Sequence, residues 1–193
     1  MGRPRAFDES EALERALQLF WRHGYESSSL EQLLAATGLS KSSFYHSFGS
    51  KAELFAAALE IYQDGQAAEI ARRLEAEADP KRALEQLIQS FTRAGAGQEK
   101  AWGCLTCNTA VELAPHDGAI AKLVAGHHRR LEKIFEDAFK RAQKAGQMTR
   151  THDPRALASF IVASLSGLQV LIRAGAERRR IDSAAKIALA AIG

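Results

Sequence analysis

The chain has 193 residues, of which 46% are hydrophobic and 25% charged, a composition typical of soluble globular proteins. Its net charge of +3 is too small to identify an anionic partner, and its two cysteines exclude a scaffold stabilised by several disulfides. Because Ala, Leu, Glu, Arg and Lys are abundant and β-branched residues are few, we expect an all-α protein.

The first predicted element is a helix that begins near Asp8. Leu13, Leu17 and Phe20 recur at the helical spacing and mark one apolar side. Gly24 ends this helix, because glycine readily adopts the left-handed conformation of a helix C-terminus.

Two short helices are predicted next. Ser28 and Ser29 both have the capping-box spacing to an acidic or amide residue, so either can begin the second helix. Gly38 breaks that helix, and Ser40 can cap a third helix over residues 41–47. Two short helices joined by a turn that contains glycine are typical of a helix-turn-helix.

The rest of the chain is expected to be helical, with no strand pattern and no internal repeat. Gly49 separates the third helix from the next one. Helices are predicted over residues 51–77, 80–94, 103–113, 117–145, 154–174 and 182–192.

One of these helices contains the longest run without a charged residue, residues 156–172. The run is close to the minimum length of a membrane span, but it also contains serine, glycine and glutamine. We therefore interpret it as a buried helix of a protein without a membrane partner. Since the N-terminus lacks the apolar region of a signal peptide, we expect a cytoplasmic protein.

Residues 39–55, LSKSSFYHSFGSKAELF, combine short polar side chains, lysines and aromatic residues within a few helical turns. Phe44 and Phe48 are four residues apart and can form a buried side of the third helix. Its other side carries polar and charged residues, namely Lys41, Ser42, Tyr45 and His46. A helix in the DNA major groove needs this combination, although an ordinary hairpin with a solvated polar face would show the same periodicity.

Residues 10–55 resemble the DNA-binding domain of the TetR family of transcriptional regulators. The resemblance runs from ALQLFWRHGYESSSLEQLLAATGLS through KSSFYHSFGSKAELF. It implies a three-helix, helix-turn-helix DNA-binding domain over residues 1–52 and a helical regulatory and dimerisation domain over residues 53–193. It also implies a transcriptional regulator without catalytic residues, cofactor or metal.

The resemblance implies DNA-binding roles for residues of the first domain. Phosphates would be contacted from helix starts by Ser28 or Ser29 and by Lys51. Base edges, flanking phosphates or thymine methyl groups would be contacted from the third helix by Lys41, Ser42, Ser43, Tyr45 and His46. In the basic N-terminal arm of this domain, Arg3 and Arg5 would enter the minor groove or contact phosphates, unless this arm is simply a disordered start.

The two cysteines, Cys104 and Cys107, are three residues apart near a predicted helix start, where a thiolate is stabilised. The segment GCLTCNTAVEL resembles a subset of the family in which a cysteine at the Cys104 position senses electrophiles or oxidants. Packing as small apolar residues is the alternative. A zinc site with His116 and His127 or His128 fits no standard spacing, and thioredoxin-like catalysis lacks the βαβ pattern it needs.

A pocket for an organic inducer would lie between helices of the second domain. The candidate lining residues, each of which could also be plain core or surface, are Phe91, Trp102, Asn108, Glu112 and Phe160. The run from His127 to Arg130 is expected to be a solvated helix face.

The predicted helices over residues 155–173 and 182–192 carry more apolar surface than one small domain needs. Small residues among them allow two helices to approach closely. We therefore predict a two-fold homodimer interface built as a four-helix bundle.

The expected function is a TetR-like repressor that binds a palindromic double-stranded DNA operator as a homodimer. A small-molecule inducer, or modification of a thiol by an electrophile or oxidant, would release it. A thiol-dependent enzyme would account for the cysteines but not for residues 39–55. A helical interaction module without a DNA partner would not explain why Ser, Tyr and Lys occur together in residues 39–55.

Overall fold

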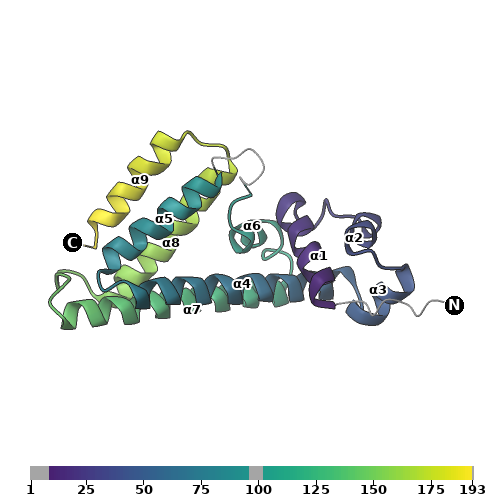
Figure 1. Cartoon of the computed structure of the whole chain (residues 1–193), viewed down its shortest axis with the longest axis horizontal. Helices are drawn as coiled ribbons and strands as arrows, with labels where there is room; N and C mark the ends of the chain where they lie inside the picture. The colour runs from purple at the N-terminus through teal and green to yellow at the C-terminus, as the bar shows by residue number, and fades with distance from the viewer. Residues whose placement is uncertain (1–8, 96–101, 193) are drawn as a thin grey trace. The chain divides into compact units, whose positions relative to one another are not determined.

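The computed structural model of the chain describes residues 9–95 and 102–192, and the side chains of residues 91–95 lie outside the description. The described residues form nine α-helices and no strand, which confirms the all-α expectation (Figure 1). The helices are α1 (Glu9–His23), α2 (Leu30–Thr37), α3 (Lys41–Phe48), α4 (Lys51–Ala76), α5 (Pro80–Gly95), α6 (Leu105–Glu112), α7 (Gly118–Lys144), α8 (Pro154–Arg173) and α9 (Arg178–Ala190).

The chain divides into two compact units, Met1–Tyr62 and Gln63–Gly193. The division falls after Tyr62 and not after residue 52, because aromatic residues at the start of α4 pack inside the first unit. The Phe55 ring contacts Phe20 edge to face at a centroid distance of 5.0 Å, and the Tyr62 ring contacts Trp21 at 4.9 Å.

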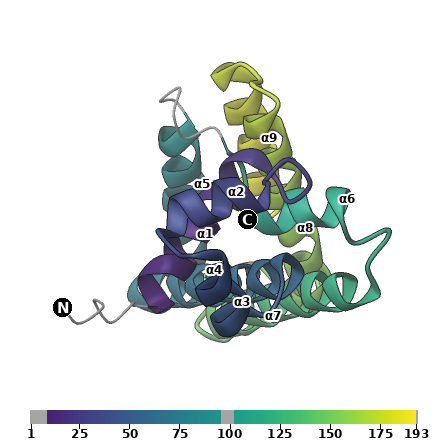
Figure 2. The ribbon, with the colours of Figure 1, turned by 90° about the vertical axis from the view of Figure 1, so that its right-hand side faces the viewer.

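The first unit contains α1, α2, α3 and the beginning of α4, and α1 packs against α2 (Figure 2). Phe20, Leu33 and Phe44 are fully buried, so one apolar side of each helix faces a common interior. The burial of these side chains supplies the stability that helices as short as α2 and α3 lack on their own.

Local hydrogen bonds explain where α2 and α3 begin. The Ser29 hydroxyl accepts from the Gln32 amide N–H, and the Gln32 side-chain oxygen accepts from the Ser29 amide N–H, which completes a capping box. Ser40 caps α3 by accepting from the Ser43 amide N–H at 3.1 Å. Between them Gly38 ends α2 with φ +73°, a conformation that favours glycine.

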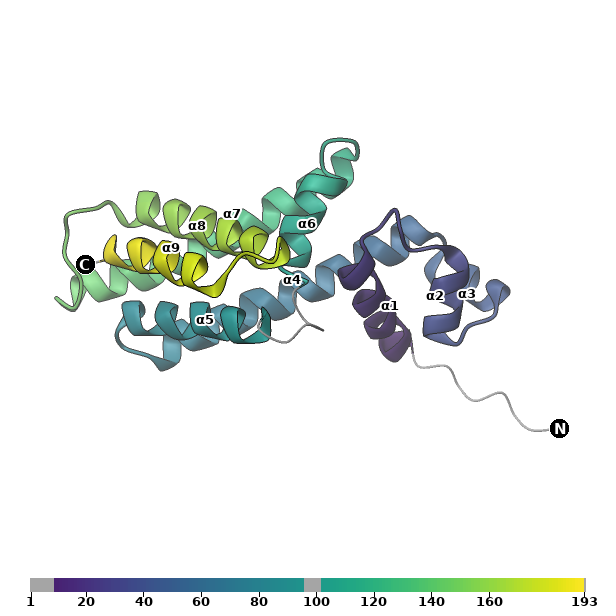
Figure 3. The same cartoon turned by 90° about the horizontal axis from the view of Figure 1, so that it is seen from above.

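The second unit is built from helices packed side by side. α7 lies along α8, and α5 and α9 both pack against α8 (Figures 1 and 3). Phe135 and Phe139 of α7, Leu84 of α5 and Ile161 of α8 are almost fully buried, and they mark the centre of the core.

Helix α8 is long and apolar enough to cross a membrane when only length and composition are considered. The structure instead buries one side of it against its neighbours, as the interpretation of residues 156–172 required. The buried residues of α8 are Leu157, Ala158, Ile161, Val162, Leu165, Leu168, Gln169 and Ile172.

The last helix begins at Arg178, whereas the apolar pattern predicted a start at residue 182. Arg178, Arg179 and Arg180 are exposed and leave no apolar period, yet arginine is a good helix former. Apolar periodicity marks only the buried part of a helix, so it placed the start too late.

Two glycines provide a matched test of this backbone. Gly38→Ala should destabilise the protein by about 1–2 kcal/mol, because its φ of +73° is unfavourable for a residue with a Cβ although no heavy atom lies within 4 Å of the site. Gly65→Ala, in the interior of α4 and equally unobstructed, should stabilise it by about 0.5–1 kcal/mol. Urea unfolding followed by circular dichroism measures both, and changes of the same sign would contradict the assignment.

Candidate DNA-binding surface and sensor cavity

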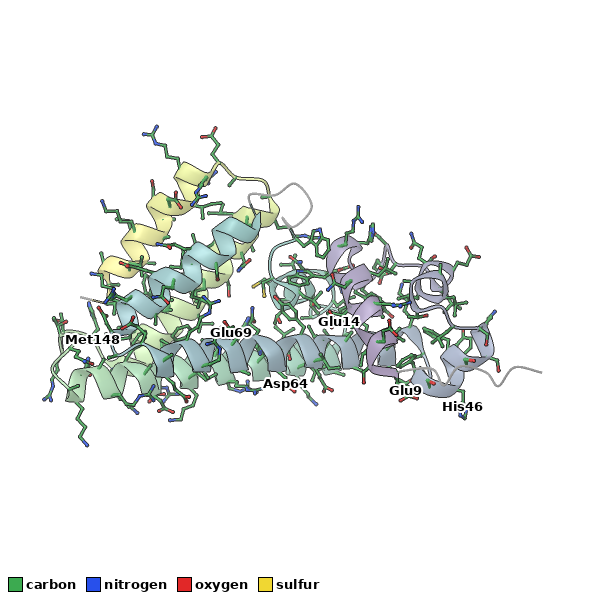
Figure 4. All side chains as sticks on the ribbon, in the orientation of Figure 1. Glu9, Glu14, His46, Asp64, Glu69 and Met148 are labelled. Atoms are coloured by element: carbon green, nitrogen blue, oxygen red, sulfur yellow. The ribbon has the colours of Figure 1, made fainter. Side chains whose placement is uncertain are left out.

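Helix α3 presents one buried and one exposed side. Phe44 is fully buried and Phe48 partly buried, which agrees with the predicted rear face. The polar residues predicted to face DNA are all exposed, namely Lys41, Ser42, Ser43, Tyr45 and His46. Figure 4 shows the His46 side chain pointing away from the helix. The helix contains no acidic residue, so this side can approach a polyanion although residues 1–55 have a net charge of −1.

The serines at the helix starts have different environments. Ser29 is exposed at the N-terminus of α2, where backbone N–H groups and the helix dipole favour a phosphate. Ser28 is fully buried, and its hydroxyl donates to the Gly24 carbonyl at 2.6 Å. The expected phosphate contact of Ser28 is therefore wrong, because its hydroxyl closes the turn after α1. In α3 the Ser43 hydroxyl lies 2.9 Å from the Ser40 hydroxyl, so it shares in the helix cap.

Lys51 begins α4 and is half-buried. Its ammonium group lies 4.3 Å from the centre of the Tyr25 ring, a cation–π contact that restricts the side chain. This contact holds the positive charge at the N-terminus of a helix, where a phosphate is also favoured. Arg3 and Arg5 fall outside the described residues.

A second candidate site lies within the second unit, around the two cysteines. Cys104 is the residue before the first turn of α6 and Cys107 lies in that turn, and both are buried. They line a cavity of about 30 Å³. The other residues around it come from α4, α6, α7 and α8, and they include Gln66, Thr106, His127, Val162 and Ser166.

The two thiols are not equivalent. A hydrogen bond to Cys104 and burial both raise the pKa of the Cys107 thiol, so Cys107 stays protonated at neutral pH. Cys104 receives a further contact, since the Gln66 amide donates to its sulfur at 3.7 Å. Donors directed at one sulfur stabilise its thiolate, and Cys104 is therefore the better candidate for a nucleophile.

His127 is buried, with 4% of its surface exposed, and the expectation of a solvated face is wrong for this residue. The α7 helix turns it inward, where its Nε2 lies 2.8 Å from the Gln66 side-chain oxygen. Burial lowers its pKa to about 4, helped by the positive charges of His128 and Arg130 and opposed by Asp64. Asp64, labelled in Figure 4, forms an ion pair with Arg130.

The other predicted pocket residues do not share this cavity. Asn108 and Glu112 line a surface groove between α6 and α8. Trp102 is half-buried, and its carbonyl accepts hydrogen bonds from Asn108 at 2.9 Å and Arg173 at 2.8 Å. Phe160 is 46% exposed and lines a separate groove at the start of α8. The Phe91 side chain falls outside the described residues.

Sequence reasoning missed most residues of the cavity, and among them are the polar Gln66, Thr106 and His127. A polar residue inside a helix gives no signal of which way it faces when its neighbours are also polar. His127 could have been found from the apolar period of α7, because Val124 and Leu131 lie three and four residues away and are both buried. Among the residues that the structure describes, no group of three or more His, Cys, Asp and Glu is arranged to hold a metal ion.

Comparison with known proteins defines the class. Residues 12–58 match the family model of bacterial regulatory proteins of the tetR family, and residues 80–188 match the tetracyclin repressor-like C-terminal domain. The chain belongs to the TetR family of transcriptional regulators. It is accordingly a regulator of transcription and not an enzyme, as the resemblance implied.

Individual relatives cover most of the chain. It is 31% identical over 193 residues to the HTH-type transcriptional regulator YezE of Bacillus subtilis, covering 100% of both chains. It is 31% identical to the transcriptional repressor ComR of Escherichia coli, covering 93% of this chain and 86% of ComR. A cysteine mutant of the TetR family regulator CifR, solved with a 26-base-pair operator DNA, superposes with a TM-score of 0.86 at 29% identity and 100% coverage of both chains.

The buried histidine makes stability depend on pH. At pH values below about 6.5 the unfolded chain binds a proton on His127, whereas the folded protein does so only near pH 4. The contribution to stability is therefore complete above pH 6.5 and is lost as the pH falls towards 4. Between pH 7 and pH 5 the wild type should lose about 2 kcal/mol more of its unfolding free energy than His127→Gln. Urea titrations at both pH values measure this, and equal losses would contradict the burial of His127.

Proposed function

We propose that this chain is a repressor that binds a palindromic operator as a homodimer and releases it when its second unit is modified or occupied. The observation that carries the DNA-binding role is the exposed side of α3, which is free of acidic residues and backed by the buried Phe44. The complex of CifR with operator DNA supports the same role here. The first unit would read DNA, the second would sense and dimerise, and the protein would act in the cytoplasm.

The proposed contacts with DNA divide into two kinds. Lys41, Ser42, Tyr45 and His46 lie on the exposed side of α3 and would reach base edges or the adjoining backbone. Ser29 and Lys51 lie at the N-termini of α2 and α4 and would hold phosphates. The arm with Arg3 and Arg5 would add minor-groove or phosphate contacts.

The proposed homodimer would form through α8 and α9. Phe160 and Val170 of α8 are 46% and 49% exposed, and Ile187 of α9 is 72% exposed. Large apolar side chains exposed on two neighbouring helices are typical of a protein–protein interface, and a two-fold axis would pair the helices in a four-helix bundle. Two reading units would then recognise half-sites about 34–36 Å apart, or a multiple of that spacing. A monomer in sedimentation at micromolar concentration would contradict this.

The proposed signal is covalent modification of Cys104. Its sulfur accepts from Gln66 and lies beside a second thiol, and both line a cavity. Oxidation would give a sulfenic acid, which Cys107 can convert to a disulfide with loss of water. A disulfide between residues three apart strains a regular helix, so the start of α6 would have to distort. A non-covalent inducer in one of the grooves is the alternative.

Two lysines test the DNA-binding surface. Lys51→Ala should weaken binding to all DNA sequences alike and lower the slope of log affinity against log salt by about one, because one phosphate contact is lost. Lys41→Ala should change which base is preferred in the half-site. Fluorescence anisotropy with operator and scrambled duplexes at several salt concentrations measures both. An unchanged affinity and slope in Lys51→Ala would show that α4 does not dock on DNA as proposed.

The thiols are tested by operator release. Hydrogen peroxide should release wild-type protein from the operator, Cys104→Ser should stay bound, and Cys107→Ser should stop at the sulfenic acid and be released less, because it cannot form the disulfide that distorts α6. Gel shifts with mass spectrometry of each sample measure release and oxidation together. Equal release of all three proteins would exclude thiol sensing and leave a non-covalent inducer.

A further inference from the structure

A hydrogen-bonded chain connects α7 to the Cys104 sulfur. His127 Nε2 lies 2.8 Å from the Gln66 Oε1 atom, and the Gln66 amide nitrogen donates to Cys104 at 3.7 Å. An amide oxygen only accepts hydrogen bonds, so the His127 proton is on Nε2. The ring is neutral at pH 7, because burial lowers its pKa to about 4. Its other nitrogen, Nδ1, therefore has an available lone pair that can accept a hydrogen bond.

The cavity contains polar atoms that the protein leaves unsatisfied. His127 Nδ1 and the Thr106 hydroxyl are buried without a hydrogen-bond partner in the described structure. The two residues are 4% and 1% exposed, and both line the cavity that Cys104 and Cys107 also line. An unsatisfied buried polar group costs about 1–3 kcal/mol, so one acceptor and one hydroxyl facing the same space indicate a polar guest.

The size of the cavity restricts that guest. A single water needs about 10–15 Å³, and the cavity volume is about 30 Å³, so there is room for about two oxygen-sized atoms. A quinone or a drug-sized inducer does not fit without repacking the helices. The guest must also donate a hydrogen bond to His127 Nδ1 and accept one from Thr106. Hydrogen peroxide has two oxygens, and each of them can donate and accept.

We propose that this cavity is a binding and reaction site for hydrogen peroxide, with His127 Nδ1 as the hydrogen-bond acceptor and Thr106 as the second hydrogen-bonding partner. The inference rests on the proposed thiol-sensing function and adds to it the identity of the oxidant and of the residues that hold it. The Gln66 amide is a positioning group, since it fixes the His127 tautomer and directs an N–H at the Cys104 sulfur.

The reaction balances with residues at the site and the peroxide alone. The bound peroxide, oriented by His127 Nδ1 and Thr106, relays the Cys104 thiol proton to the oxygen that will leave. The sulfur then attacks one peroxide oxygen, so that an S–O bond forms and the O–O bond breaks. The leaving oxygen takes the electron pair of that bond and receives the relayed thiol proton, and it departs as water. Cys104 is oxidised to a sulfenic acid by two electrons, and the peroxide is reduced by two.

Kinetic variants test the two polar groups. His127→Gln keeps an N–H near the Nε2 position for Gln66 but loses the ring nitrogen that accepts from the peroxide, and it should slow Cys104 oxidation by hydrogen peroxide about tenfold. Thr106→Val should slow it about tenfold. Thr109→Val is the matched control, because Thr109 is equally buried in α6 and donates to the Leu105 carbonyl outside the cavity. The reaction is stopped with acid, and the remaining Cys104 thiol is counted by mass spectrometry after unfolding.

A second comparison tests the size of the site. Cumene hydroperoxide carries the same O–O bond on a bulky group, so wild-type protein should react with it much more slowly than with hydrogen peroxide. Val162→Ala enlarges the cavity and should shift the ratio of the two rates towards the bulky reagent. Val124→Ala is the control, because Val124 is also buried in α7 but is not among the residues that line the cavity.

Two results would overturn the inference. One is oxidation of His127→Gln and Thr106→Val at the wild-type rate, and the other is equal reactivity of wild-type protein with both peroxides. Operator binding measured on the same samples separates this inference from the proposed function. Oxidation that depends on His127 but leaves the operator bound would contradict the release mechanism and support the site. Release of His127→Gln and Thr106→Val from the operator at the wild-type rate would contradict the site and leave the proposed thiol sensing intact.

Discussion

The first unit depends on the burial of a few large side chains by helices that are too short to persist alone. α2 and α3 have eight residues each, whereas an isolated helix needs about 12–15 residues to be even marginally stable in water. Both exist because Leu33 and Phe44 are fully buried, together with Phe20 of α1 and Phe55 of α4. That burial also fixes the rotation of α3 about its own axis. With Phe44 inward, the polar residues of α3 must face solvent, so the proposed reading surface is a consequence of packing.

The second unit combines an apolar core with a small polar cavity, and the buried polar groups of the cavity are unfavourable for stability. His127, Thr106 and Gln66 bring polar atoms to a space bounded mostly by buried side chains. A core built only for stability would place apolar residues of similar volume there, since buried polar groups without partners are unfavourable. The arrangement fits the proposed thiol sensing, in which the Gln66 amide directed at Cys104 would stabilise its thiolate and His127 would hold the oxidant.

The composition of helix α8 is compatible with more than one structural environment. Its length and apolar character satisfy the criteria for a membrane span, but half of that character belongs to the core. Phe160 and Val170 lie on the side that the core does not cover. The order of small and large residues along a helix does not show which side faces the core, because that depends on which neighbouring helices pack against it. Phe160 is 46% exposed and lines a groove at the start of α8, so its role as a lining residue of a ligand pocket stays a prediction.

The sequence by itself determined the helical class, most helix ends, and the helix-turn-helix with its exposed polar residues. These features depend on interactions between residues close in the chain. Capping by Ser40, the left-handed Gly38 and the burial of Phe44 can be predicted from residues close in the chain, which left Ser28 and Ser29 as alternatives for the start of α2. Only the tertiary structure decided that Ser28 closes a turn, that the first unit extends to Tyr62, and that His127 meets Gln66 and Cys104. The residues of that cavity come from α4, α6, α7 and α8, and their meeting depends on how whole helices pack, which no local pattern encodes.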